Sequence, residues 1–165
     1  MISPVGNPAG SYGYLRSNDG FGIYATLPEQ GQTCLVAFAF CSGEVWTIDT
    51  ITLRVRSVSE LPILFLNESD FGVSLKRYSE FLSKLGVPPP YRWVAGMEGL
   101  KGRAMYLPAP PGRAPSGVPQ GHGVGDAVVT TGFYRMEEDP EISMAPFFEE
   151  IYQNCCLERP NWLKR

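Results

Sequence analysis

One histidine and one nearby carboxylate are the residues best suited to acid–base chemistry in this chain of 165 residues. His122 is the only histidine, and Asp126 follows it within a glycine-rich segment. A histidine acts as a general base when a second group orients it and a nucleophile lies within hydrogen-bond reach. Neither a Gly-x-Ser-x-Gly motif nor a cysteine at a helix start supplies that nucleophile. We therefore predict no catalytic residue and interpret the chain as a non-enzyme.

Two glycine-rich loops are the candidates for binding a small ligand. Residues 96–102 have the spacing Gly-x-x-Gly-x-x-Gly, and residues 121–125 have glycine at every second position. Neither loop has the spacing of a dinucleotide site or the Gly-Lys-Ser/Thr of a phosphate-binding loop, and turn formation explains both. The alternative is a small-ligand or nucleotide sensor whose pocket is flanked by the two loops. Its contact residues would be Gly99, Lys101, Gly102 and His122.

The four cysteines do not form the pattern of a metal site. The chain has no Cys-x-x-Cys and only one histidine, so we predict neither a metal nor a cofactor. Cys34 and Cys41 fall in or next to one expected strand, on opposite faces and too far apart to form a disulfide. Cys155 and Cys156 are adjacent, and a disulfide between neighbours is strained. Four free thiols are consistent with a reducing compartment.

Charge is distributed unevenly along the chain, which has a net charge of −3. A chain with no basic excess lacks the attraction for phosphates on which nucleic-acid binding depends, although Arg92 and Trp93 combine a cation with an aromatic ring. Residues 137–158 contain seven carboxylates and no lysine or arginine. This acidic stretch is either a solvated face or a surface for a protein partner. The residues assigned to that surface are Glu137, Glu138, Asp139, Glu149 and Glu150.

Strands are expected in the first third of the chain. Residues 12–16 and 21–27 flank an Asn-Asp-Gly turn, and residues 33–40 and 44–56 flank Ser42-Gly43. Within 33–40 the large residues Val36, Phe38 and Phe40 share one face, and the other face is smaller. This pattern is typical of a central strand covered on both sides, with the smaller face suited to close helix packing. A change of apolar phase in 44–56 predicts a bulge near Asp49-Thr50.

The best helix prediction covers residues 68–85. Asn67 or Ser69 would cap it, and apolar residues recur at spacings of three and four from Phe71 to Leu85. Further strands are expected at 91–95, 103–107 and 127–134, and a last helix at 146–157. This order predicts an α+β fold, a mainly antiparallel sheet packed by two principal helices. We expect Trp162 to plug the C-terminal tail against the core.

The composition predicts one domain. Residues 1–11 are interpreted as a flexible leader and residues 12–165 as a single α+β domain. Ten of the eighteen residues in 108–125 are glycine or proline, which indicates a long loop. The start of the chain has neither a basic nor an apolar segment of a targeting signal, so the expected location is cytoplasmic and away from membranes.

The chain also resembles a known family. An aromatic and aliphatic hairpin is followed by a helix ending in Leu85-Gly86-Val87, by the motif Gly99-Leu100-Lys101-Gly102 and by an Arg159-Pro160-Asn161 tail. In this order they resemble the C-terminal accessory region of bacterial Schlafen-like proteins, over residues 11–161. Those proteins carry an AlbA-type ATP- or nucleic-acid-binding domain ahead of this region, and that domain has no counterpart in this sequence. The resemblance implies an accessory or interaction domain of a regulatory or defence system.

Together these observations favour a non-enzymatic interaction or regulatory domain that acts through protein–protein contacts, with self-association as a corollary. The ligand or nucleotide sensor is the alternative. A hydrolase or transferase and a nucleic-acid-binding domain are minor hypotheses.

Overall fold

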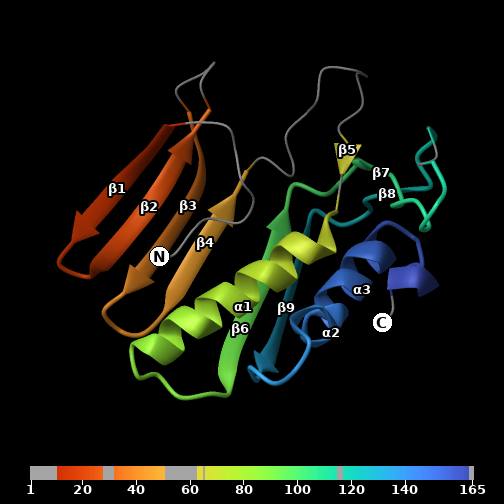
Figure 1. Ribbon diagram of the computed structural model, residues 1–165. Helices are drawn as coiled ribbons and strands as arrows, with labels where there is room; N and C mark the ends of the chain where they lie inside the picture. Colours follow the sequence, from red (N-terminus) through yellow and green to blue (C-terminus); the bar gives the residue numbers. More distant parts are fainter. Residues whose placement is uncertain (1–10, 28–31, 51–62, 65, 115–116, 164–165) are drawn as a thin grey trace.

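A four-stranded antiparallel sheet forms the first part of the fold (Figure 1). The computed structural model describes residues 11–27, 32–50, 63–64, 66–114 and 117–163. The sheet is a meander of neighbouring strands: β1 (Ser11–Ser17), β2 (Gly20–Thr26), β3 (Thr33–Phe40) and β4 (Val45–Asp49). Gly43 turns the chain between β3 and β4 with a φ of 90°, a conformation that glycine adopts without strain. Both predicted hairpins are therefore confirmed.

The second part combines helices with two smaller sheets. The helix α1 (Glu68–Lys84) leads into β6 (Tyr91–Glu98), which pairs antiparallel with β9 (Ala127–Tyr134). A small mixed sheet consists of β5 (Ile63–Leu64), β7 (Ala104–Met105) and β8 (Gly121–His122). The chain continues through α2 (Pro140–Ser143), α3 (Ala145–Asn154) and a 3₁₀ turn, η1 (Asn161–Leu163). The predicted α+β class is confirmed.

Helix α1 holds the two parts together because it contributes to two apolar clusters. Tyr78 and Phe81 pack on Ile23 and Ala37 of the four-stranded sheet. About two helical turns before Tyr78, Phe71 and its neighbours pack into the main core of β6, β9 and α3. The small side chain of Ala37 lets the helix approach the sheet closely, as the pattern of β3 predicted. The expected apolar stripe is shorter than predicted, since Leu85 lies beyond the end of α1 and is exposed.

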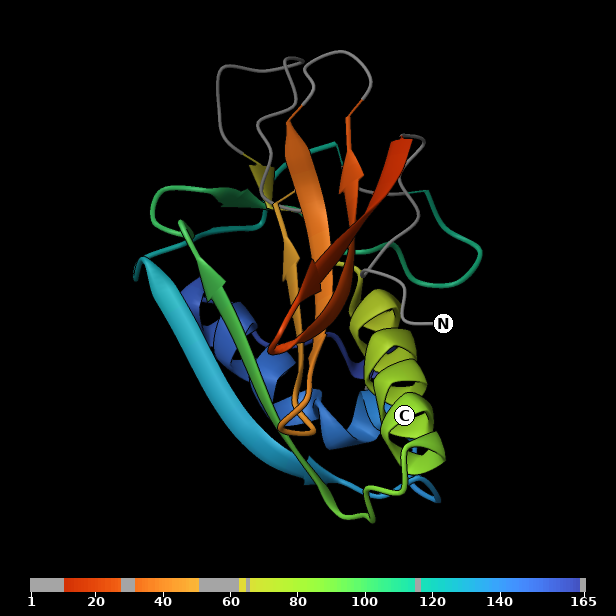
Figure 2. The same cartoon turned by 90° about the vertical axis from the view of Figure 1, so that its left-hand side faces the viewer.

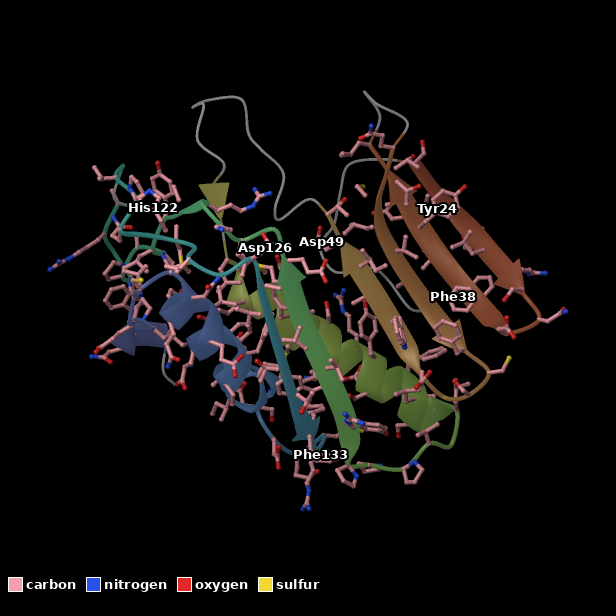
Figure 3. All side chains as sticks on the ribbon, turned by 180° about the vertical axis from the view of Figure 1, so that it is seen from behind. Tyr24, Phe38, Asp49, His122, Asp126 and Phe133 are labelled. Atoms are coloured by element: carbon pink, nitrogen blue, oxygen red, sulfur yellow. The ribbon has the colours of Figure 1, made fainter. Side chains whose placement is uncertain are left out.

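The helices lie on one side of the strands. Helix α1 lies in front of β6 in Figure 1 and behind it in Figure 3, and Figure 2 shows the helices on one side of β6 and β9. The opposite side of β1–β4 and of β6–β9 carries no helix of the described chain. The prediction that β3 is covered on both sides is therefore wrong as far as the helices are concerned. Helix α1 covers the Ala37 face of the sheet, and no helix of the described chain covers the Phe38 face. None of the helices within the described ranges is long and apolar enough to cross a membrane.

Element boundaries differ from the predictions in the second half. The last helix ends at Asn154 rather than at 157, because the chain turns out of helical geometry at Cys156, whose φ is 57°. The short α2 was missed; Asp139 caps it by accepting a hydrogen bond from the Glu141 amide at 2.8 Å, and Pro140 occupies its first turn. Strand β6 extends to Glu98, whereas β7 has only two residues.

Other predictions fall partly outside the described residues. The predicted bulge near Asp49-Thr50 is not seen as far as the described residues reach, since Asp49 pairs regularly with Leu35 and the Thr50 amide donates to the Cys34 carbonyl at 3.0 Å. Residues 51–62, which would complete the change of apolar phase, lie outside the described ranges. The irregularity that the structure does contain is at Ala25 and Thr26 in β2. Most of the predicted leader lies outside the described residues, and Ser11 already belongs to β1. Asn67 occupies the N-cap position of α1 without a side-chain capping bond.

Candidate functional site

The outer face of the four-stranded sheet, turned away from α1, carries a group of large apolar side chains. Register places these side chains on one side of the sheet, since Tyr24 pairs with Val36, Val36 with Ile48, and Phe38 with Trp46. The hairpin partner β1 adds Leu15, which pairs with Gly22. We call this surface the aromatic face. Its members are Leu15, Tyr24, Val36, Phe38, Phe40, Trp46 and Ile48.

Glycines on neighbouring strands make room for two of these rings. A Cβ added at Gly13 would lie 2.3 Å from the Tyr24 ring, and one added at Gly22 would lie 2.6 Å from the Phe38 ring. Both rings therefore lie over the backbone of the next strand instead of standing away from the sheet. Figure 3 shows Tyr24 and Phe38 on β2 and β3. This arrangement shields the two glycines from solvent. It also makes the β1–β3 part of the aromatic face flatter, because the two rings do not project from the sheet.

The β4 side of the aromatic face is the most exposed. Trp46 is 62% exposed and Ile48 is 57% exposed. Trp46 meets the edge of Phe40 at a centroid distance of 6.1 Å, and Phe40 lies 4.6 Å from Phe38. These aromatic contacts join the β3 and β4 side chains into one continuous patch. Contiguous apolar patches larger than a few hundred Å² are uncommon on monomers and mark interaction sites.

The outer face of β6 and β9 continues this apolar character on the same side of the molecule. Val94, Val129 and Phe133 are each more than 60% exposed there. Figure 3 shows Phe133 near the end of β9, in a view that also faces the aromatic face. Among the paired residues of these two outer faces, the only charged side chains are Arg92 and Glu98, which lie near opposite ends of β6.

The candidate acid–base pair of His122 and Asp126 does not form. His122 lies on β8 opposite Ala104, whereas Asp126 precedes β9, and both side chains are exposed. Figure 3 shows them on separate parts of the chain. Asp126 uses its backbone carbonyl to accept a hydrogen bond from the Leu100 amide at 2.9 Å. The structure therefore gives His122 no orienting carboxylate from Asp126.

The two glycine-rich loops do meet, but they bond to one another. The Gly102 amide donates to the Gly123 carbonyl at 2.8 Å, and the Gly123 amide donates to the Arg103 carbonyl at 3.0 Å. Lys101 forms a parallel bridge with Gly123. A Cβ added at Gly123 would lie 2.0 Å from the Leu100 carbonyl oxygen, so the two backbones are in direct contact. Amides that would cradle a phosphate are already used.

Gly99 and Gly102 have turn conformations, with φ of 75° and 76°. Gly96, which the sequence placed in the same loop, lies instead within β6. The turn-forming interpretation is therefore confirmed for Gly99 and Gly102 and wrong for Gly96.

The predicted acidic surface is divided between local roles and a cavity. Glu138 accepts a hydrogen bond from Ser143 at 3.1 Å, and Glu150 accepts one from Thr130 at 2.8 Å. Glu137 is exposed before α2. Asp139 and Glu149 line a cavity of about 200 Å³. The structure therefore brings Asp139 and Glu149 to one cavity, and the role of the five carboxylates as a partner surface stays a prediction.

A buried ion pair next to this cavity was missed in the sequence. Arg159 lines the cavity and binds Glu68 at the start of α1, and both side chains are 5% exposed. A neighbouring cavity of about 300 Å³ is lined by Glu68 and Trp162. Trp162 is 40% exposed, so the prediction that it plugs the tail is wrong, and Arg159 anchors the tail instead. No local signal could have found the pair, because its members are 91 residues apart.

Buried hydroxyl and thiol groups near α3 have shifted acidities. Burial, assisted by the negative charge of Glu68, raises the pKa of Tyr152 far above its ordinary value. Burial also raises the pKa of the Cys155 thiol, which makes it a weak nucleophile. All four cysteines are free, with Cys34 and Cys155 buried and Cys41 and Cys156 exposed. Within the described ranges, no group of three or more metal-binding side chains is close enough to hold an ion.

No family model, no curated protein and no solved structure matches this chain.

Proposed function

We propose that this protein is a non-enzymatic interaction domain of a regulatory kind, which binds another protein through its aromatic face. The observation that carries the proposal is the exposure of Trp46 and Ile48 on a sheet face whose paired residues include no charged side chain. Burying such a face removes apolar area from water without desolvating a charge. Tryptophan is also enriched among the residues that dominate binding energy at protein interfaces.

Two further points support this function over the sensor. The backbone amides of the glycine-rich loops are already bonded, which weighs against a phosphate or nucleotide site between them. The resemblance to an accessory region of Schlafen-like proteins likewise favours an interaction role. The exposed acidic residues Glu137 and Glu149 would then lie outside the primary contact.

The test is site-specific photo-crosslinking in the protein's native cells. A photoreactive phenylalanine analogue replaces Trp46 in one variant and Tyr14 in the control. Tyr14 is 65% exposed but lies on the opposite face of the sheet, since it pairs with Ile23. We expect adducts from position 46 that disappear when Ile48→Lys is added, and none from position 14. Equal labelling from both positions, or none from position 46, would contradict the proposed function.

A further inference from the structure

We propose that the protein bound by the aromatic face is a second copy of this chain. The two copies pack sheet against sheet about a two-fold axis that runs across the strands between them. This inference rests on the proposed function, because it names the partner for the same surface. Two features carry it: the area that the two outer faces offer, and the placement of their two charges.

The area buried in a stable dimer determines how much of the outer side of the molecule must take part in the contact. Four strands of about six residues have a footprint of roughly 400 Å². Contact through this face alone would bury roughly 800 Å² over both copies, which is the size of a crystal contact. The outer face of β6 and β9 adds roughly 260 Å² per copy. With both faces the total reaches roughly 1,300 Å², within the range of stable protein interfaces.

The included surface is apolar over the second pair of strands as well. Val94, Val129 and Phe133 are exposed there. Figure 3 shows Phe133 from the same side as Tyr24 and Phe38 of the aromatic face. Sheets that pack face to face lie about 10 Å apart, with their strands within about 30° of alignment. A second copy matches this surface, because it offers the same kind of sheet face, apolar apart from Arg92 and Glu98 among its paired residues.

The two charges fix the direction of the second copy. Arg92 and Glu98 both point to the outer side of β6, six positions apart, and carry opposite signs. No ion pair to either residue is found among the described residues. A two-fold axis that crosses β6 near its centre makes the two β6 strands antiparallel. Arg92 of one copy then faces Glu98 of the other, twice per dimer.

The experiment is sedimentation equilibrium on the purified full chain, from low micromolar to several hundred micromolar concentration. We expect the wild type to dimerise reversibly. Arg92→Glu and Glu98→Arg should each weaken the dimer by roughly three- to thirtyfold, because each reversal opposes like charges twice. The double reversal should restore the wild-type dissociation constant to within about threefold. Ile48→Lys should abolish dimerisation by placing an unpaired charge in the contact.

The control is Lys76→Glu, a charge reversal at an exposed position on α1, which should leave the dimer unchanged. Thermal unfolding of each variant verifies that it is folded. A wild type that stays monomeric, single reversals without effect, or a double reversal without rescue would each overturn the second-copy inference. The crosslinking assay distinguishes failure of the second-copy inference from failure of the proposed function. Adducts from position 46 to a different protein would support the proposed function and contradict the inference that the partner is a second copy.

Discussion

The guanidinium of Arg159 and the carboxylate of Glu68 form a bidentate, buried ion pair between the C-terminal tail and the start of α1. Nη2 of Arg159 lies 2.5 Å from Oε2 of Glu68, and Nε lies 3.1 Å from both carboxylate oxygens. Arg159 also donates to the Leu163 carbonyl at 2.9 Å, and its guanidinium lies 5.6 Å from the centre of the Phe148 ring. One side chain thus fixes α1, α3 and the tail together.

Arg159→Ala should destabilise the protein by about 3–5 kcal/mol, because Glu68 would be left buried without a counter-charge. Arg159→Lys should recover only part of this loss, since an ammonium cannot reproduce the planar, bidentate contact. Urea unfolding monitored by tryptophan fluorescence measures both effects. Arg113→Ala is the control, because Arg113 is exposed and should change stability by less than about 0.5 kcal/mol. Equal stability of the Arg113 and Arg159 alanine variants would show that the pair contributes nothing.

Alkaline pH should destabilise the protein through Tyr152. Burial and the nearby Glu68 charge raise the pKa of this tyrosine in the folded state, so the folded protein retains the proton more strongly than the unfolded chain. The associated stability is complete below the unfolded pKa of about 10 and is lost as pH rises above that value. Tyr152→Phe should reduce the fall in melting temperature between neutral pH and pH above 10. The corresponding substitution Tyr78→Phe provides the comparison, because burial also raises the pKa of Tyr78.

The same substitution also tests the buried hydroxyl itself. The Tyr152 hydroxyl is buried without a hydrogen bond of good geometry to any described residue, although the Glu68 carboxylate is close enough to raise its pKa. Removing an unpartnered polar atom should therefore leave the stability at neutral pH unchanged or slightly higher. A loss of more than about 1 kcal/mol at neutral pH would mean that the hydroxyl has a partner.

Gly22→Ala should destabilise the four-stranded sheet by about 1–3 kcal/mol. The new Cβ would lie 2.6 Å from the Phe38 ring and 2.8 Å from the Ala37 carbonyl oxygen, so both the ring and the backbone of β3 would have to move. Gly117→Ala is the matched control, because a Cβ there meets nothing within 4 Å. Chemical denaturation compares the two. If both substitutions cost the same, the Phe38 ring does not occupy the space above Gly22.

The sequence predicts the first half of this fold well because its signals there are local. Turn residues such as Gly43 and the alternation of Val36, Phe38 and Phe40 determine the hairpins within a few positions. The helix α1 follows in the same way from its apolar periodicity. What the alternation could not reveal is how much of the Phe38 side of β3 is covered, since coverage depends on elements distant in sequence.

The candidate sites were less predictable because they depend on such distant pairings. The contact of the two glycine-rich loops converts candidate phosphate-binding amides into ordinary backbone bonds, and neither motif shows this by itself. The Arg159 and Glu68 pair leaves no trace in local spacing. The exposed neighbours Trp46 and Ile48 were visible in the sequence, but their significance depends on which side of the sheet α1 covers.

ATP, ADP and inorganic phosphate should not stabilise the protein. The Gly102, Gly123 and Gly125 amides donate to protein oxygens within the loops or on α3, so a phosphate would have to break these bonds before it could bind. A true site at a hundredfold excess of ligand over Kd would add about 2.7 kcal/mol, which a thermal-shift assay detects as an increase of several degrees. Lys101→Ala should leave the melting curve in each ligand unchanged. A reproducible increase that Lys101→Ala removes would restore the nucleotide-sensor hypothesis and require the loops to open.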